Sequence, residues 1–133
     1  TKDQRERVMS AAHVRDGQAK VAEVDVAMEK VNDAELPYLK GLEVIAVKEA
    51  NEAVQASEAA AAGVKAAIAA ARNFIASKNL EIKQYGEAAS KPAVEEFGKL
   101  TVQINAAASR LAQFRHDTEG RKKTALMQEA GEK

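Results

Sequence analysis

His13 and His116 are the two histidines of this sequence, and histidine is a common metal ligand. Neither has a cysteine, a second histidine or an acidic residue at a spacing that would complete a metal shell. Asp117 follows His116 directly, but neighbouring residues of a helix point in different directions. The sequence therefore predicts that both histidines are exposed helix residues and that the protein holds no metal and no cofactor.

The carboxylates, hydroxyls and glycines also lack a catalytic pattern. Four closely spaced glutamates have none of the Glu-x-x-His pairs that hold di-iron centres in helical bundles; they are Glu43, Glu49, Glu52 and Glu58. No serine lies in a nucleophile-elbow sequence, and the seven glycines have neither the GxGxxG spacing nor that of a P-loop. We therefore predict that the protein is not an enzyme and has no small-molecule substrate.

One charged segment near the C-terminus could contact a partner. Its five basic residues stand against Asp117 and Glu119; the five are Arg110, Arg115, Arg121, Lys122 and Lys123. We favour the hypothesis that this segment is an ordinary solvated helix surface. It could also pair with the acidic start of a preceding helix and set the register between the two. The third hypothesis is a contact surface for an acidic polymer such as a cytoskeletal filament or nucleic acid.

The composition favours a long, thin protein over a thick globule. The 133 residues include 29 alanines, which bury little surface, while aromatic residues make up 4% and tryptophan is absent. Lys plus Arg number 20, as do Asp plus Glu, so the net charge is zero and nucleic acid is not an expected partner. Uncharged runs such as Ala59–Val64 are much shorter than the roughly 20 residues of a membrane span. With no cysteine and no signal peptide, we predict a cytoplasmic protein.

Three helices must position these residues. A row of mostly apolar or small residues, with alternating steps of three and four, runs through the middle of the chain and predicts one very long helix. The row comprises Val47, Ala50, Val54, Ser57, Ala61, Val64, Ile68, Ala71, Ile75, Lys78, Ile82 and Tyr85. Because proline breaks a helix interior but fits a first turn, Pro37 and Pro92 divide the chain into helices near 3–34, 38–85 and 92–130.

Glycine and serine residues suggest how the helices end. Gly86 is predicted to end the central helix in the left-handed conformation, and residues 88–92 to form a connector in which Ser90 caps the third helix. A break at 77–79 is the alternative, but the apolar row stays in register across it. Three glycines inside the predicted helices each cost about 1 kcal/mol relative to alanine and are expected at close contacts or mild bends; they are Gly63, Gly98 and Gly120.

Small residues predict how the second and third helices pack. Nine of the thirteen residues from 59 to 71 are alanine. Small side chains let two helices approach toward the short end of the 8–10 Å range of axis separations. Folding the chain back at 86–92 brings residues 106–108, which are all alanine, beside residues 69–71. We therefore predict an antiparallel hairpin with the first helix packed along it; the alternative is that the alanine surface docks a helix of another chain.

A similar spacing occurs near both ends of the chain. Arg5, Val8, Met9 and Ala12 are matched by Lys123, Leu126, Met127 and Ala130. Either helices of this kind share the spacing by chance, or the chain is one repeat of a longer array. The predicted architecture resembles spectrin-type repeats in shape, although no tryptophan is present. We predict an all-α, elongated three-helix bundle or antiparallel coiled coil that forms one helical domain over residues 1–133, as a fragment or one repeat of a longer protein.

The predicted function follows from this architecture. We expect a structural or scaffolding segment that acts through protein–protein contacts, with other protein chains, including further copies of itself in a dimer or filament, as partners. The alternative is a helix-docking module for a cytoskeletal filament or another acidic partner. The sequence leaves open which chain is bound and how many copies associate.

Overall fold

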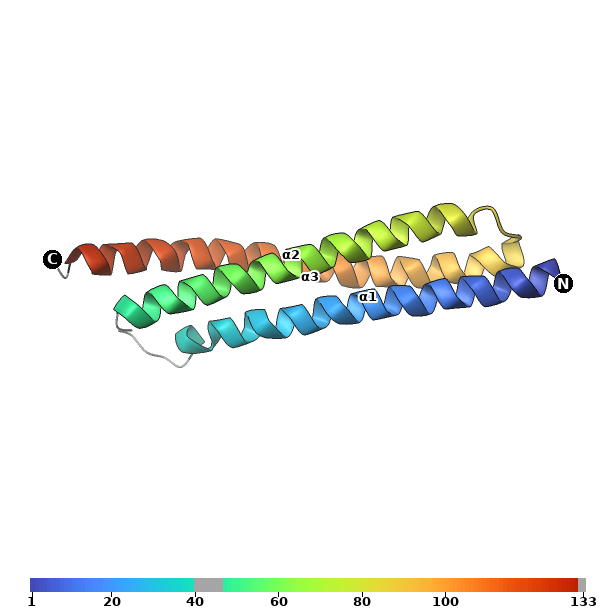
Figure 1. Cartoon of the computed structure of the whole chain (residues 1–133). Helices are drawn as coiled ribbons and strands as arrows, with labels where there is room; N and C mark the ends of the chain where they lie inside the picture. The colour runs from blue at the N-terminus through green and yellow to red at the C-terminus, as the bar shows by residue number, and fades with distance from the viewer. Residues whose placement is uncertain (40–46, 132–133) are drawn as a thin grey trace.

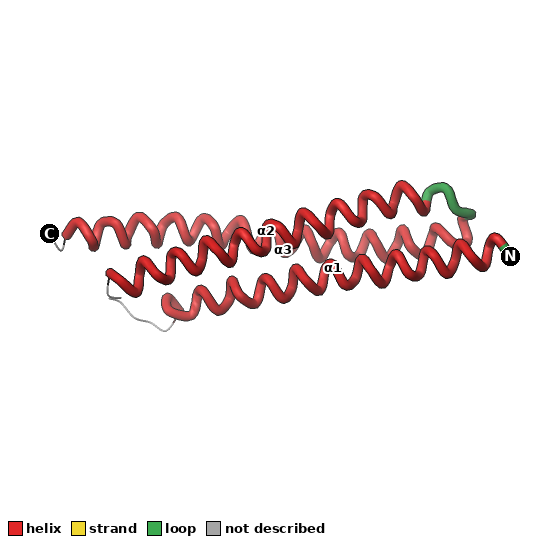
Figure 2. The backbone as a smooth tube through the Cα atoms, viewed as in Figure 1, coloured by secondary structure: helices red, strands yellow, loops and turns green. Residues whose placement is uncertain are grey.

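The computed structural model describes residues 1–39 and 47–131, which form three long helices. α1 spans Lys2–Leu39, α2 spans Val47–Ile82 and α3 spans Glu87–Gly131. They lie side by side in an elongated bundle, with α2 antiparallel to both α1 and α3 (Figure 1). Every pair of helices is in contact, and none of the described residues is in a strand (Figure 2). The prediction of an all-α three-helix bundle is confirmed.

The apolar row of the sequence is the buried face of α2. Nine of its twelve positions are buried, and Val47, Lys78 and Tyr85 are half-buried. Residues at alternating steps of three and four share one side of a helix, so a single stripe faces the other two helices along the full length of α2. The opposite side of α2 is exposed to solvent.

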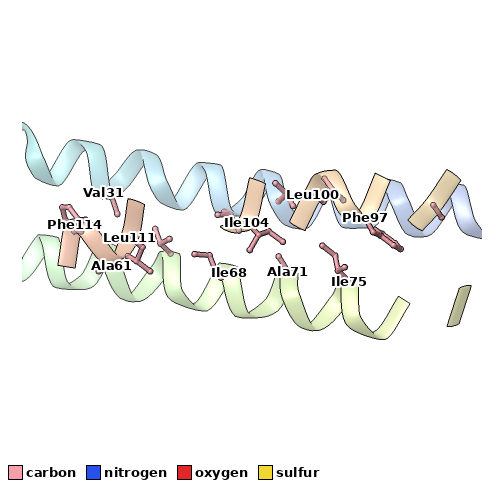
Figure 3. Close-up of a cluster of buried hydrophobic side chains, with 14 of the residues drawn as sticks. Val31, Ala61, Ile68, Ala71, Ile75, Phe97, Leu100, Ile104, Leu111 and Phe114 are labelled. Atoms are coloured by element: carbon pink, nitrogen blue, oxygen red, sulfur yellow. The ribbon is translucent and has the colours of Figure 1, made fainter. Parts of the chain in front are cut away.

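α1 and α3 complete the core with larger side chains. Figure 3 shows the α3 side chains pointing toward Ile68, Ala71 and Ile75 of α2. The α1 and α3 members of the core are Val21, Val24, Val31, Ala93, Phe97, Leu100, Ile104, Leu111 and Phe114. α2 therefore contributes alanine, valine and isoleucine to the core, and the larger phenylalanine and leucine side chains of α3 fill the space between the two helices.

The register of the α2–α3 hairpin agrees with the prediction from the alanine patches. Arg72 Nη2 donates a hydrogen bond to Asn105 Oδ1 at 3.1 Å. Arg72 directly follows Ala71, and Asn105 directly precedes Ala106, so the bond places the end of one patch beside the start of the other. Ala61 and Ala71 are buried in the core of their own bundle, which favours internal packing over docking of a foreign helix at these positions.

Both prolines lie inside helices, so the predicted boundaries near them are wrong. α1 continues through Pro37 to Leu39 instead of ending at 34. Pro37 lies two residues before the end of α1, so the hydrogen bond that its missing N–H removes, and any kink at its ring, affect only the last turn. Residues 40–46, in which the second helix is predicted to begin, lie outside the described residues.

The chain reverses between Ile82, the last residue of α2, and Glu87, the first residue of α3. The sequence predicts this reversal at 86–92, so α2 ends earlier and α3 begins earlier than expected. Pro92 consequently lies inside α3 and does not start it. The early start of α3 buries Ala89, which an irregular connector would leave exposed to water.

Gly86 has a different role from the predicted one. Its carbonyl oxygen accepts hydrogen bonds from the backbone N–H groups of Ala89 (3.0 Å) and Ser90 (2.9 Å), so Gly86 begins α3 and does not end α2. Its φ lies outside the left-handed region. Its own N–H donates to Glu6 Oε1 at 3.0 Å, which ties the corner to the start of α1. The predictions of a left-handed Gly86 and a Ser90 cap are therefore wrong.

Gly17 of α1 lies close against α3, unlike the three glycines singled out in the sequence. A Cβ atom at Gly17 would lie 3.1 Å from Phe97 Cε1 and 3.2 Å from Leu100 Cδ1. At the three glycines singled out in the sequence, a Cβ atom would have no neighbour within 4 Å; they are Gly63, Gly98 and Gly120. The expectation of close contacts at those three positions is wrong, because they face solvent.

We expect opposite effects from two Gly→Ala substitutions. Gly98→Ala should raise the free energy of unfolding by about 1 kcal/mol. Alanine restricts the conformations of the unfolded chain, and its methyl group would meet no other atom within 4 Å on α3. Gly17→Ala should lower it by about 1–2 kcal/mol, because the methyl group crowds Phe97 and Leu100. Urea denaturation of the two variants measures both values. Stabilisation by Gly17→Ala as large as that by Gly98→Ala would contradict the close contact.

Candidate functional site

The basic segment, residues 110–123 of α3, lies against both other helices. Arg110 and Arg121 converge on Glu35 of α1: Arg110 Nη2 donates a hydrogen bond to Glu35 Oε1, and Arg121 Nη2 lies 3.6 Å from Glu35 Oε2. Arg110 Nη2 also donates to Asn32 Oδ1 at 3.3 Å. The Glu35 side chain is only 10% exposed, so its charge is shielded from water and compensated by two guanidinium groups.

Helical spacing explains why these two arginines reach the same carboxylate. Arg110 and Arg121 are about three turns apart on α3, so both face α1. Their side chains extend toward Glu35 from opposite directions along the helix axis. Each also lies over an aromatic ring: the Arg110 guanidinium is 5.9 Å from the centre of Phe114, and that of Arg121 is 4.2 Å from the centre of Tyr38. The cluster therefore couples α1 to α3.

Tyr38 is partly buried beside Arg121 at the end of α1. Burial raises the pKa of its phenol, and the positive charge of Arg121 acts in the opposite direction. The phenol accordingly stays neutral at physiological pH. Its ring supports the Arg121 guanidinium and has no acid–base role in the bundle.

Lys122 pairs with α2. Its Nζ atom lies 3.3 Å from Glu58 Oε1, and both side chains are about half exposed. This pair is the predicted contact between the basic end of the third helix and the acidic start of the second. Exposed pairs of this kind contribute less than about 1 kcal/mol, so the pair helps to set the register and adds little stability. Glu49 and Glu52 form no ion pair within the described residues, and Glu43 lies outside them.

Arg115 and Lys123 are exposed, and neither forms an ion pair with the side chains of residues 1–38 and 47–127. Arg115 lines a shallow groove of about 270 Å³ between α2 and α3, together with Lys65, Glu58 and Glu119. The charges around this groove are mixed. The structure thus brings Arg110 and Arg121 together at Glu35 and leaves no continuous basic surface along the segment.

His13 belongs to a second polar cluster, near the α2–α3 corner. Its side chain is 12% exposed, so the prediction of an exposed histidine is wrong here, whereas His116 is exposed as predicted. His13 Nε2 lies 3.3 Å from Glu81 Oε1, and Lys78 Nζ donates to Glu81 Oε2 at 3.1 Å. The Tyr85 hydroxyl donates to Glu81 Oε1 at 3.3 Å. The cluster joins α1 to the end of α2.

Glu81 is the centre of this second cluster. The hydrogen bond from Lys78 lowers the pKa of the Glu81 carboxyl, although partial desolvation acts in the opposite direction. Burial raises the pKa of Tyr85, and the negative charge of Glu81 adds to that effect. A stable carboxylate paired with the Lys78 ammonium and bonded to a neutral phenol is typical of a structural ion pair. It does not resemble an acid–base pair poised for proton transfer.

Metal-binding groups do not cluster in the described part of the chain. No three His, Asp or Glu side chains there lie close enough to hold an ion. A groove of about 510 Å³ lies between α1 and the start of α3, lined mainly by alanine, valine and proline with Arg7 and Arg15 at its edge. It is open to solvent, so it does not isolate a ligand from water as the pockets of enzymes do.

α2 is long and apolar enough to cross a membrane by length and composition. The core helix of a helical bundle meets the same criterion, and α2 buries its apolar stripe against α1 and α3. The exposed side of α2 owes its hydropathy to alanine and carries few large apolar side chains. Packing within the bundle therefore accounts for the apolar stripe of α2, and alanine accounts for the hydropathy of its exposed side.

Known proteins offer no assignment. None of the protein-family models, curated protein sequences or solved structures compared with this chain matches it. The function has to be argued from the geometry of the three helices and the chemistry of their surfaces.

Proposed function

We propose that the chain is a structural segment, a rigid helical spacer or scaffold that acts through contacts with other proteins. The observation that carries this proposal is the alignment of three long helices along almost their full length (Figure 1). At about 1.5 Å per residue, the 45 residues of α3 extend about 68 Å. Three helices packed 8–10 Å apart make a bundle roughly 20 Å wide. The molecule is therefore several times longer than it is wide.

The continuity of the core supports a rigid spacer. Buried residues occur at the corner end, with Ile82 and Ala93, and at the opposite end, with Val54 and Ala125. Between these ends the stripe of α2 has no gap. α2 is therefore held by both neighbours along its length, and bending it at one point would open packed contacts in two interfaces.

The two segments with matching residue spacing, 5–12 and 123–130, lie where they support a role in a longer assembly. Val8 at the start of α1 is 67% exposed, and Leu126 and Met127 near the end of α3 are 56% and 75% exposed. They lie at opposite ends of the bundle, and α3 extends past the end of α1 (Figure 1). Exposed apolar residues at both ends are what an end-to-end array of units would cover. We propose such an array as the setting in which this segment works.

Small-angle X-ray scattering tests the spacer directly. A rod of about 68 Å has a radius of gyration of about 20 Å, whereas a compact protein of this length has one of about 14 Å. Spin labels at the exposed Val94 and Leu126 of α3 should give one narrow distance distribution near 48 Å, from about 1.5 Å per residue. A compact scattering profile, or a broad distribution between the labels, would overturn the proposal.

The structure gives less support to the second candidate, a docking surface for an acidic filament. Arg110, Arg121 and Lys122 are all engaged with glutamates of the same chain. An acidic partner would have to compete with Glu35 and Glu58 for these side chains. The geometry therefore supports a structural role for these three basic residues, which pair with glutamates of the same bundle.

A further inference from the structure

An open groove runs between α1 and α2 on the face away from α3. Its volume is about 760 Å³. Glu23, Val26, Lys30 and Asp33 of α1 line one side, and Ala56, Ala59 and Gly63 of α2 line the other. Val26 is 57% exposed, and a Cβ atom at Gly63 would meet nothing within 4 Å. The α2 side has no charge and no bulky side chain, so another helix could approach its backbone closely.

The α1 side of this groove has a charge pattern that is complementary to itself. Glu23, Val26 and Lys30 are spaced by three and four residues, so they form one exposed stripe. Glu23 and Lys30 are two turns apart, too far to pair with each other, and neither forms an ion pair within the described part of the chain. If a copy of α1 lies antiparallel, with a two-fold axis between residues 26 and 27, the order of the charges is reversed. Glu23 then faces Lys30 of the other copy, and Asp33, which also lines the groove, faces Lys20.

We propose that this groove binds a second copy of the chain, antiparallel and related by a two-fold axis. Glu23 of each copy pairs with Lys30 of the other, so the same ion pair forms twice. Val26 packs on its equivalent at the axis, and the small residues of α2 let the second copy enter the groove. The copies lie side by side, so the dimer is about as long as one bundle. This inference rests on the proposed function, because it names the partner of a segment that works through protein contacts.

Charge reversal tests the proposed two-fold arrangement. Sedimentation equilibrium of the wild-type chain should show a monomer–dimer equilibrium. Glu23→Lys and Lys30→Glu should each weaken dimerisation at least about tenfold, since each replaces two attractive pairs by two repulsive ones and every 1.4 kcal/mol is a factor of ten. The double variant, Glu23→Lys with Lys30→Glu, should restore the wild-type dissociation constant, because the reversed pairs again match. An unrelated partner surface would not be rescued in this way.

Controls separate dimerisation from folding. All three charge variants should melt like the wild type at a concentration where each is monomeric, because both side chains are exposed. Gly63→Leu, which fills the groove without touching the core, should also abolish the dimer and leave the monomer helical. A chain that stays monomeric up to about 1 mM would overturn the proposal, because even an association free energy of about −4 kcal/mol would be detected there. So would a dimer that tolerates both single charge reversals.

The two proposals fail separately. A monomer with an elongated scattering profile would overturn the dimer and leave the spacer intact. A compact monomer would overturn the spacer, and the dimer with it.

Discussion

Replacing Phe114 with alanine should lower the free energy of unfolding by about 3–5 kcal/mol. Phe114 is fully buried at 0% exposure, and its ring lies in the core with Leu111 and with Ala61 of α2 (Figure 3). The loss combines the transfer of a large apolar side chain with the cavity that remains, since straight helices cannot collapse into it. A domain of this size has a total stability of roughly 7–20 kcal/mol, so the change is a large part of it.

The matched control for Phe114→Ala is Val102→Ala on the same helix. Val102 is 68% exposed, so its truncation should change the free energy of unfolding by less than about 0.5 kcal/mol. Urea denaturation followed by circular dichroism measures both variants. A Phe114→Ala variant within about 1 kcal/mol of the wild type would show that the ring is not in the core.

The second large effect is expected at Glu35, where the carboxylate holds two arginines of α3. Glu35→Ala should lower the free energy of unfolding by about 2 kcal/mol, because Arg110 and Arg121 lose their acceptor while partly buried. The estimate is at the low end for buried pairs, since the Arg110 side chain is 38% exposed and water screens its charge. Glu35→Ala combined with Arg121→Met should lose less than the sum of the two single changes.

Glu96→Ala is the control for Glu35→Ala. It removes the exposed pair with Lys99 within α3, so its effect should be below about 0.5 kcal/mol. Guanidinium chloride would screen the ion pairs themselves, so urea is the suitable denaturant. Equal effects of the two substitutions would mean that Glu35 acts as an ordinary surface charge.

The sequence was most informative about α2. The spacing of its apolar row depends only on the 3.6-residue period of the helix, so burial of Val64, Ile68 and Ile75 could be predicted from the chain alone. The fold class and the register of the α2–α3 hairpin followed from the same periodicity and from the alanine patches. A local pattern of this kind fixes which face is buried, because any partner helix has to cover it.

The ends of the helices could not be predicted as well. Proline lacks an N–H that the first turn of a helix does not use, and glycine adopts helical and non-helical conformations alike, so neither residue fixes a helix end by itself. Pro37 and Pro92 therefore lie inside helices, and Gly86 begins α3. Packing decided these positions: α3 gains by burying Ala89, and the Gly86 N–H gains an acceptor in Glu6.

The contacts of the basic segment could also be predicted only in part. Charge along the helices singled out the basic segment, and pairing with the acidic start of α2 was one of three hypotheses, of which a solvated surface was the favoured one. The sequence did not reveal Glu35, because that glutamate lies on α1, far from Arg110 and Arg121 in the chain. A possible signal was its place among hydrophobic residues on the buried side of α1, where a charge needs compensation.

Three long helices and a thin, alanine-rich interface were determined by the sequence itself, because helix propensity and a repeating apolar stripe act between near neighbours. Only the tertiary structure decided where the chain turns, which glycine lies against another helix, and which arginines share a carboxylate. Those outcomes depend on the order in which the helices surround the core, and that order brings together residues such as Gly17 and Phe97, or Glu35 and Arg110, that no local pattern connects.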